Sequence, residues 1–193
     1  MRDVVLTAFI FSLLPFVFKR PWLGVLLWTW IGMMSPHRLT WGFAYSMQFA
    51  AIVGVVTLIA LLFSKEQKRY PFTPVTVTLI LLVLWMNISY LFAINPTSYP
   101  YDQWDKVMKI QFFIAVTMLV MTTVERIGWL VWVATMSIAF FGIKGGVFTL
   151  TSGGGSMVLG PEGGFISRNT EISLAITMAI PLLRYLQMQS PKR

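Results

Sequence analysis

The stretch GFAYSMQFAAIVGVVTLIALLF, residues 42–63, decides the fold class because it contains no charged residue. A helix that spans a membrane needs about 20 consecutive, mostly apolar residues. This run has that length and composition, and it is the clearest of its kind along the chain. It therefore predicts a transmembrane helix and makes the chain a candidate membrane protein.

The composition of the rest of the chain points the same way. Apolar residues make up 56% of the sequence and charged residues 11%, and the mean hydropathy is +0.72. A soluble domain would carry about 25% charged residues. The net charge of +8 is best explained by cations in cytoplasmic loops, so we expect no nucleic-acid partner. The absence of cysteine excludes disulfides, thiolate metal sites and a cysteine nucleophile.

Seven apolar runs predict an all-α, polytopic transmembrane helical bundle that forms a single domain over residues 1–193. The first two runs are short, and Lys19, Arg20 and Pro21 separate them. Two cations at mid-membrane would be costly, so a short hairpin is favoured over one long helix. The runs are residues 4–18, 22–34, 42–63, 75–94, 107–124, 129–150 and 172–186.

The distribution of cations predicts a periplasmic N-terminus. With this orientation, nine cations and two acids lie in the cytoplasm, against six cations and five acids outside. The basic loop at residues 64–74 contributes most of this bias. Three polar segments then share the outer face: residues 35–42, 95–109 and 151–171.

The segment 151–171 is the most distinctive of the three. Six glycines and one proline between Gly153 and Gly164 exclude regular helix over most of it. Exposed main-chain N–H groups, together with Arg168, would suit an anionic phosphate. Asn169 or Thr170 could cap the seventh helix. An ordinary flexible loop is the alternative, and the segment lacks the Lys-Ser of a nucleotide-binding loop.

The segment 95–109 also has two interpretations. Its two Asp–Lys pairs have i,i+4 spacing, which is typical of a solvated helix entrance, although the lysines could instead serve an anion. The pairs are Asp102 with Lys106 and Asp105 with Lys109.

Lys144 and His37 leave similar alternatives. Lys144 lies within the sixth run and either reaches the membrane interface or faces a cavity beside Gly145 and Gly146. His37, the sole histidine, is an interfacial residue or a catalytic base. No His, Asp and Glu cluster has metal-ligand spacing, so no metal is expected.

Several segments together resemble the O-glycosylation ligases associated with the exosortase A system, within the O-antigen ligase and polymerase superfamily. They are residues 1–45, QWDKVMKIQ (103–111), IKGGVFTL (143–150), GPEGGFI (160–166) and NTEISLAITMAIPLLRY (169–185). The chain is similar to the N-terminal portion of these proteins, which are about twice as long. One departure is local: Thr170 stands between Asn169 and Glu171 where the family has a second asparagine.

The resemblance implies a multi-pass protein of the bacterial inner membrane. Such enzymes transfer a glycan from a polyprenyl-pyrophosphate carrier to an acceptor at the periplasmic side, without a metal or other cofactor. Their best-supported catalytic residues lie in the second half, so this portion is expected to be inactive alone. Glu171 is a local candidate for the base. The candidate substrate-binding residues are Arg38, Lys106, Lys109, Lys144, Arg168 and Asn169.

Two other functions compete with a ligase. One is a non-enzymatic scaffold or accessory subunit that works with exopolysaccharide assembly proteins. The other is a transporter or channel in which a helix is broken at Lys144–Gly146. The transporter would show inverted repeats, and the sequence contains none.

Overall fold

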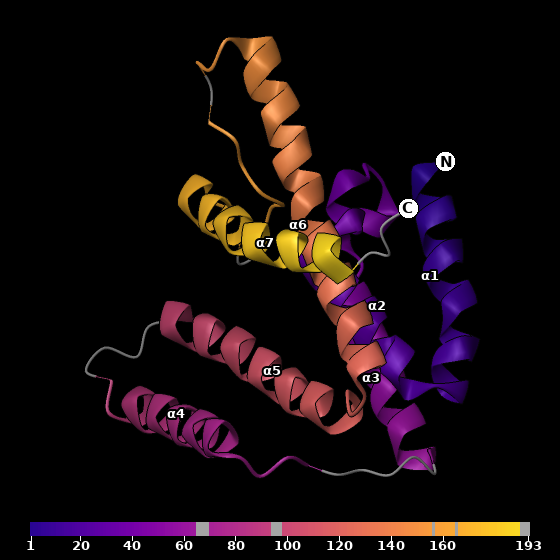
Figure 1. Cartoon of the computed structure of the whole chain (residues 1–193), viewed down its shortest axis with the longest axis vertical. Helices are drawn as coiled ribbons and strands as arrows, with labels where there is room; N and C mark the ends of the chain where they lie inside the picture. Colours follow the sequence, from indigo (N-terminus) through magenta and orange to yellow (C-terminus); the bar gives the residue numbers. More distant parts are fainter. Residues whose placement is uncertain (65–69, 94–97, 156, 165, 190–193) are drawn as a thin grey trace. The chain divides into compact units, whose positions relative to one another are not determined.

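The computed structural model describes residues 1–64, 70–93, 98–155, 157–164 and 166–189 (Figure 1). Helices are the regular elements of these residues, and no strand is found among them. They form two units, residues 1–64 with 123–193 and residues 65–122, each described here by itself. The elements are α1 (Arg2–Lys19), α2 (Pro21–Met34), η1 (Pro36–Leu39), η2 (Phe43–Ser46), α3 (Phe49–Phe63), α4 (Pro74–Leu91), α5 (Ser98–Val120), α6 (Val124–Ser152) and α7 (Asn169–Gln189).

The predicted hairpin at the N-terminus is confirmed. Arg20 has extended backbone angles, φ −141° and ψ 90°, which separate α1 from α2. Pro21 is the first residue of α2, a position where its missing N–H costs no hydrogen bond and its fixed φ suits the helix. The two helices pack against each other and both pack against α3.

The predicted start of the third helix is wrong. The apolar run begins at Gly42, but α3 begins only at Phe49, and residues 43–46 form the 3₁₀ turn η2 instead. The Asp3 carboxylate accepts hydrogen bonds from the backbone N–H groups of Gly42 (3.0 Å) and Ala44 (3.3 Å). This contact with α1 satisfies backbone donors without a longer helix, which a search for apolar runs does not detect.

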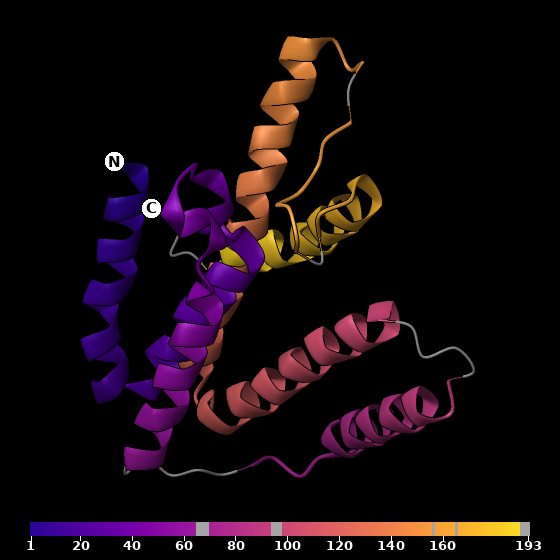
Figure 2. The ribbon, with the colours of Figure 1, turned by 180° about the vertical axis from the view of Figure 1, so that it is seen from behind.

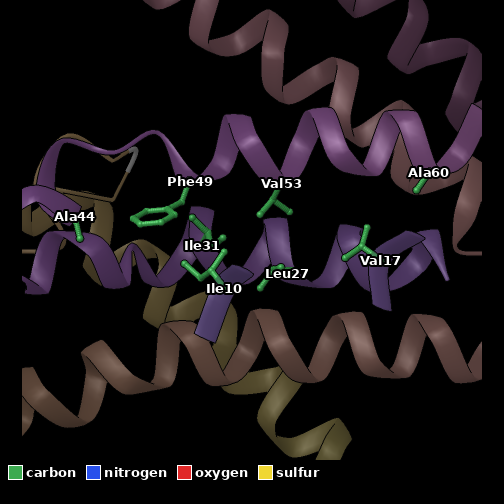
Figure 3. Packing of buried hydrophobic residues seen from close by; sticks show 8 residues of the cluster. All are labelled: Ile10, Val17, Leu27, Ile31, Ala44, Phe49, Val53 and Ala60. Carbon is green, nitrogen blue, oxygen red and sulfur yellow. The ribbon is translucent and has the colours of Figure 1, made fainter. Parts of the chain in front are cut away.

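The core of the first unit lies between α1, α2 and α3. Figure 3 shows its buried side chains, among them Ile10, Ile31 and Phe49, which point toward one another from the three helices. Gly24 allows the close approach of α2 to α3, because a Cβ at this position would collide with the Thr57 hydroxyl. Both views of the ribbon show α6 running along this group (Figures 1 and 2), and α6 packs against α2 and α7.

The second unit consists of α4 and α5. The Asn87 carboxamide oxygen on α4 accepts a hydrogen bond from the Trp104 indole N–H on α5 (3.2 Å). Tyr90 stacks on the same indole with ring centroids 5.1 Å apart. The Asn87 amide N–H also donates to the Met108 sulfur on α5 (3.4 Å), so an aromatic pair and two interhelical hydrogen bonds hold the helices together.

Among the described residues, two helices, α4 and α6, are long and apolar enough to cross a membrane, and α2 and α3 are shorter apolar helices. The α4 window has a mean hydropathy of 1.8, but only 6% of it is buried within the described residues. The helix α6 continues through Lys144, Gly145 and Gly146. The helix break that a transporter would need there is therefore absent.

Candidate functional site

The site is built where the loop after α2 meets the glycine-rich segment after α6. Asp3, in the first turn of α1, holds the loop after α2 through hydrogen bonds to its carboxylate. Partial burial disfavours its charged form, but the N–H groups of Ala44 and Gly42 more than offset this, so the pKa of Asp3 lies below its usual value. The ionised carboxylate thus orders residues 42–44.

Arg38, on η1, lies between an aromatic ring and a glycine. Its guanidinium carbon is 4.6 Å from the centroid of the Tyr45 ring, a cation–π contact. A Cβ built on Gly163 would lie only 3.3 Å from the Arg38 Nη2. The guanidinium therefore lies against the main chain of the glycine-rich segment, at a position where any larger residue would crowd it.

The Tyr45 hydroxyl connects the same two segments. It donates a 2.7 Å hydrogen bond to Oε2 of Glu162, 117 residues away in the sequence. Within the described residues, the guanidinium of Arg38 makes no hydrogen bond or ion pair, not even with Glu162. The Tyr45 ring and the Gly163 main chain therefore hold the Arg38 guanidinium in position, and its N–H groups can still donate hydrogen bonds to a ligand.

The glycine-rich segment has an ordered geometry of its own. The Gly160 N–H donates to the Ser167 carbonyl (3.0 Å), which closes a small loop. A side chain at Gly160 would collide with the backbone of Ile166, and Gly163 has φ +75°, in the left-handed region that favours glycine. Gly145 on α6 leaves room for Val158, since a Cβ there would lie 2.7 Å from a Val158 methyl group. These contacts bring the segment back against α6.

The two ends of α2 contact different parts of this unit, the start of α6 at one end and the glycine-rich segment beyond the other. Trp22, in the first turn of α2, has the Arg126 guanidinium 5.7 Å from its ring centroid. Arg38 and its partners follow the last turn of the same helix. The start of α1, the loop after α2 and residues 162–163 therefore meet at one end of this unit.

The prediction that Asn169 or Thr170 caps the N-terminus of α7 is wrong. The helix begins at Asn169, so neither Asn169 nor Thr170 is the residue that precedes it. Instead, Oε2 of Glu171 accepts a hydrogen bond from the backbone N–H of Arg168 (2.9 Å), in the manner of the acidic residue of a capping box. The carboxylate proposed as a base thus stabilises the helix start, while the Arg168 and Asn169 side chains are exposed.

The three lysines of the predicted site are all exposed. Lys144 lies on the surface of α6, and both of its interpretations, the membrane interface and a cavity, stay predictions. Lys109 forms the predicted ion pair with Asp105 on α5 (2.5 Å), whereas the described residues show no such pair between Asp102 and Lys106. Since Lys106 and Lys109 belong to the other unit, their predicted link with Arg38 stays a prediction.

His37 is half-buried beside Arg38. Removal from water lowers its pKa, and the neighbouring Arg38 charge lowers it further. Its Nδ1 is buried and has no hydrogen-bond partner among the described residues. Neutral imidazole is therefore the favoured form at pH 7.

Sequence reasoning missed Tyr45 and Glu162. Tyr45 lies inside the run that predicts the third membrane helix, and the sequence presents Glu162 only as one of the acids on the outer face. Tyr45 and Glu162 are identified by their direct contact, although they are 117 residues apart in the sequence. Only the folded structure shows that contact.

A cavity of about 560 Å³ lies in the same unit, away from these polar groups. Side chains of α1, α2 and α6 line it, and nearly all are apolar, among them Phe16, Leu27 and Trp132. Met34, one of the lining residues, is four residues before Arg38. The cavity suits a hydrocarbon chain, whereas Arg38 suits an anion.

The described residues contain no group of three His, Asp or Glu side chains that could hold a metal ion. Residues 1–190 match the DUF5935 family of unknown function, and the chain belongs to that family. No curated protein and no solved structure matches the chain.

Proposed function

We propose that this member of the DUF5935 family binds the pyrophosphate head of a polyprenyl-linked glycan at Arg38, as the donor-binding part of a glycan ligase in the bacterial inner membrane. The observation that carries the proposal is the Arg38 guanidinium, held between Tyr45 and Gly163 with its N–H donors unused by the described residues. A guanidinium presents two parallel N–H groups to phosphate oxygens, and such charge-assisted bonds are about twice as strong as neutral ones.

The chemistry of glycan transfer explains why a cation is needed. When the sugar leaves its carrier, negative charge develops on the pyrophosphate, and a fixed cation stabilises that charge. In a reaction without a metal, arginine and lysine supply the positive charge. Arg168 and Lys144, exposed on the same unit, are further candidates for this role.

A membrane setting accounts for the dimensions of α6. Twenty residues of helix rise about 30 Å, the thickness of the hydrocarbon core. If α6 enters the membrane at Val124, its first 20 residues bring Lys144 to the far boundary, and the glycine-rich segment then emerges on the periplasmic side. The exposed apolar surface of α4 likewise has a natural partner in lipid.

A non-enzymatic accessory subunit is the second candidate function. It is favoured because both acids of the glycine-rich segment are already engaged, Glu162 by Tyr45 and Glu171 by the Arg168 N–H. Glycan transfer by the chain, assayed with a lipid-linked donor and lost on Arg38→Ala, would exclude this alternative.

The direct test is the binding of farnesyl pyrophosphate and inorganic pyrophosphate to the purified chain in detergent. Charge-assisted hydrogen bonds contribute about 1.5–3 kcal/mol each, so we expect Arg38→Ala to weaken binding of both probes about tenfold or more. Arg184→Ala removes the same charge from the exposed surface of α7 and should bind like the wild type. Equal binding by the Arg38 variant and the wild type would refute the proposal.

A further inference from the structure

We propose that Tyr45 is a positioning residue that keeps the Glu162 carboxylate away from Arg38, and so keeps Arg38 free for an anionic ligand. The inference rests on the proposed function for the identity of the ligand, but the arrangement of the three side chains is independent of it. Neither Tyr45 nor Glu162 was among the residues expected to bind substrate.

The first step concerns the proximity of opposite charges. Glu162 directly precedes Gly163, whose main chain lies against the Arg38 guanidinium. A carboxylate one residue away from a glycine that lies against a guanidinium can form a two-pronged ion pair with that guanidinium. The structure shows no such pair, and Glu162 instead accepts the 2.7 Å hydrogen bond from Tyr45.

The second step concerns the double role of Tyr45. The face of its ring holds the Arg38 guanidinium, and its hydroxyl holds Glu162. One side chain therefore orients the cation and occupies the nearest competing anion. An aromatic residue without a hydroxyl would fulfil only the first role.

The consequence is a specific pattern of substitutions. In Tyr45→Phe the ring still packs on Arg38, but Glu162 is released and can pair with the guanidinium. Exposed ion pairs of this kind are weak, so the competition should reduce pyrophosphate affinity about two- to fivefold. In Tyr45→Phe/Glu162→Gln the competing charge is gone, and binding should return to the wild-type level.

The binding experiment compares these variants with farnesyl pyrophosphate as the probe. Restored affinity in the double variant supports the inference, because a purely structural loss at Tyr45 would not be repaired by a change at Glu162. Wild-type affinity in Tyr45→Phe, or a double variant as weak as the single one, would overturn it.

A second measurement needs no ligand and separates this inference from the proposed function. Phenylglyoxal modifies guanidinium groups, and an ion-paired guanidinium reacts more slowly. We expect Arg38 of Tyr45→Phe to be modified more slowly than in the wild type, as measured by peptide mass spectrometry, and Glu162→Gln to restore the rate. Equal rates in all three proteins would refute the role of Tyr45, whereas loss of pyrophosphate binding alone would concern only the ligand.

Discussion

The substitution Gly163→Ala tests whether the glycine-rich segment must approach Arg38 as closely as the structure shows. Gly163 has φ +75°, and a residue with a Cβ pays roughly 1–2 kcal/mol in the left-handed region. The new methyl group would also lie 3.3 Å from the Arg38 Nη2, so the guanidinium would have to shift by a few tenths of an ångström. Both effects disfavour the observed loop.

The expected result follows from this free energy. If the loop conformation is marginally stable, a cost of 1–2 kcal/mol reduces its population, and with it the apparent affinity for pyrophosphate, by up to about 5- to 30-fold. Isothermal titration of the detergent-solubilised chain measures the affinity. Hydrogen exchange at the Gly160 amide, which bonds to Ser167, reports the loop directly and should become faster.

Gly155→Ala is the matched control in the same segment. Its φ is not positive, and the nearest atom to an added Cβ is 4.0 Å away, an ordinary contact. This variant should bind pyrophosphate like the wild type. Unchanged binding and exchange in Gly163→Ala, or an equal loss in both variants, would show that the approach of Gly163 to Arg38 does not matter.

Three further predictions concern the same unit. Gly160→Ala should disrupt the small loop more severely than Gly163→Ala, because the new methyl group would collide with the backbone of Ile166. We expect faster proteolysis after residue 152 in this variant. Unchanged proteolysis would contradict the prediction. Asp3→Ala should speed hydrogen exchange at the Gly42 and Ala44 amides, and unchanged exchange would mean that another group holds them. Because the pKa of His37 is lowered in the folded chain, the unfolded chain takes up a proton on this residue at a higher pH than the folded chain does. The contribution of His37 to the free energy of unfolding is therefore greatest above about pH 6.5 and decreases as the pH falls toward the pKa of the folded chain. Thermal unfolding at about pH 7.5 and pH 5.5 should show this decrease, and His37→Gln should reduce it.

Much of the helical organisation could be predicted from the sequence. Apolar runs are local signals, and the Lys19–Pro21 break and the glycines after Ser152 are local as well. The prediction of helix at Gly42–Gln48 is wrong because a residue distant in sequence, Asp3, accepts the hydrogen bonds of the Gly42 and Ala44 N–H groups. A pattern of apolar residues cannot distinguish a helix from a turn whose donors are satisfied by another helix.

The candidate site was predictable only in part. Arg38 and the glycine-rich segment were identified separately, from charge and from backbone freedom. Their contact depends on how η1 and the segment at 160–167 pack, and so does the hydrogen bond between Tyr45 and Glu162. Glu171 shows the opposite case, since an acid near a glycine loop suggested catalysis while its hydrogen bond is that of a helix cap.

The proposed function requires the loop bearing Arg38 and the glycine-rich segment to share the periplasmic surface of the membrane. The chain has no cysteine, so single cysteines can be introduced in place of Trp41, Glu162 and Glu125, all exposed. A membrane-impermeant maleimide added to cells with a permeable outer membrane should label positions 41 and 162, while position 125 should react only after the inner membrane is opened. Protection of position 162 in intact cells, or labelling of position 125, would contradict the account.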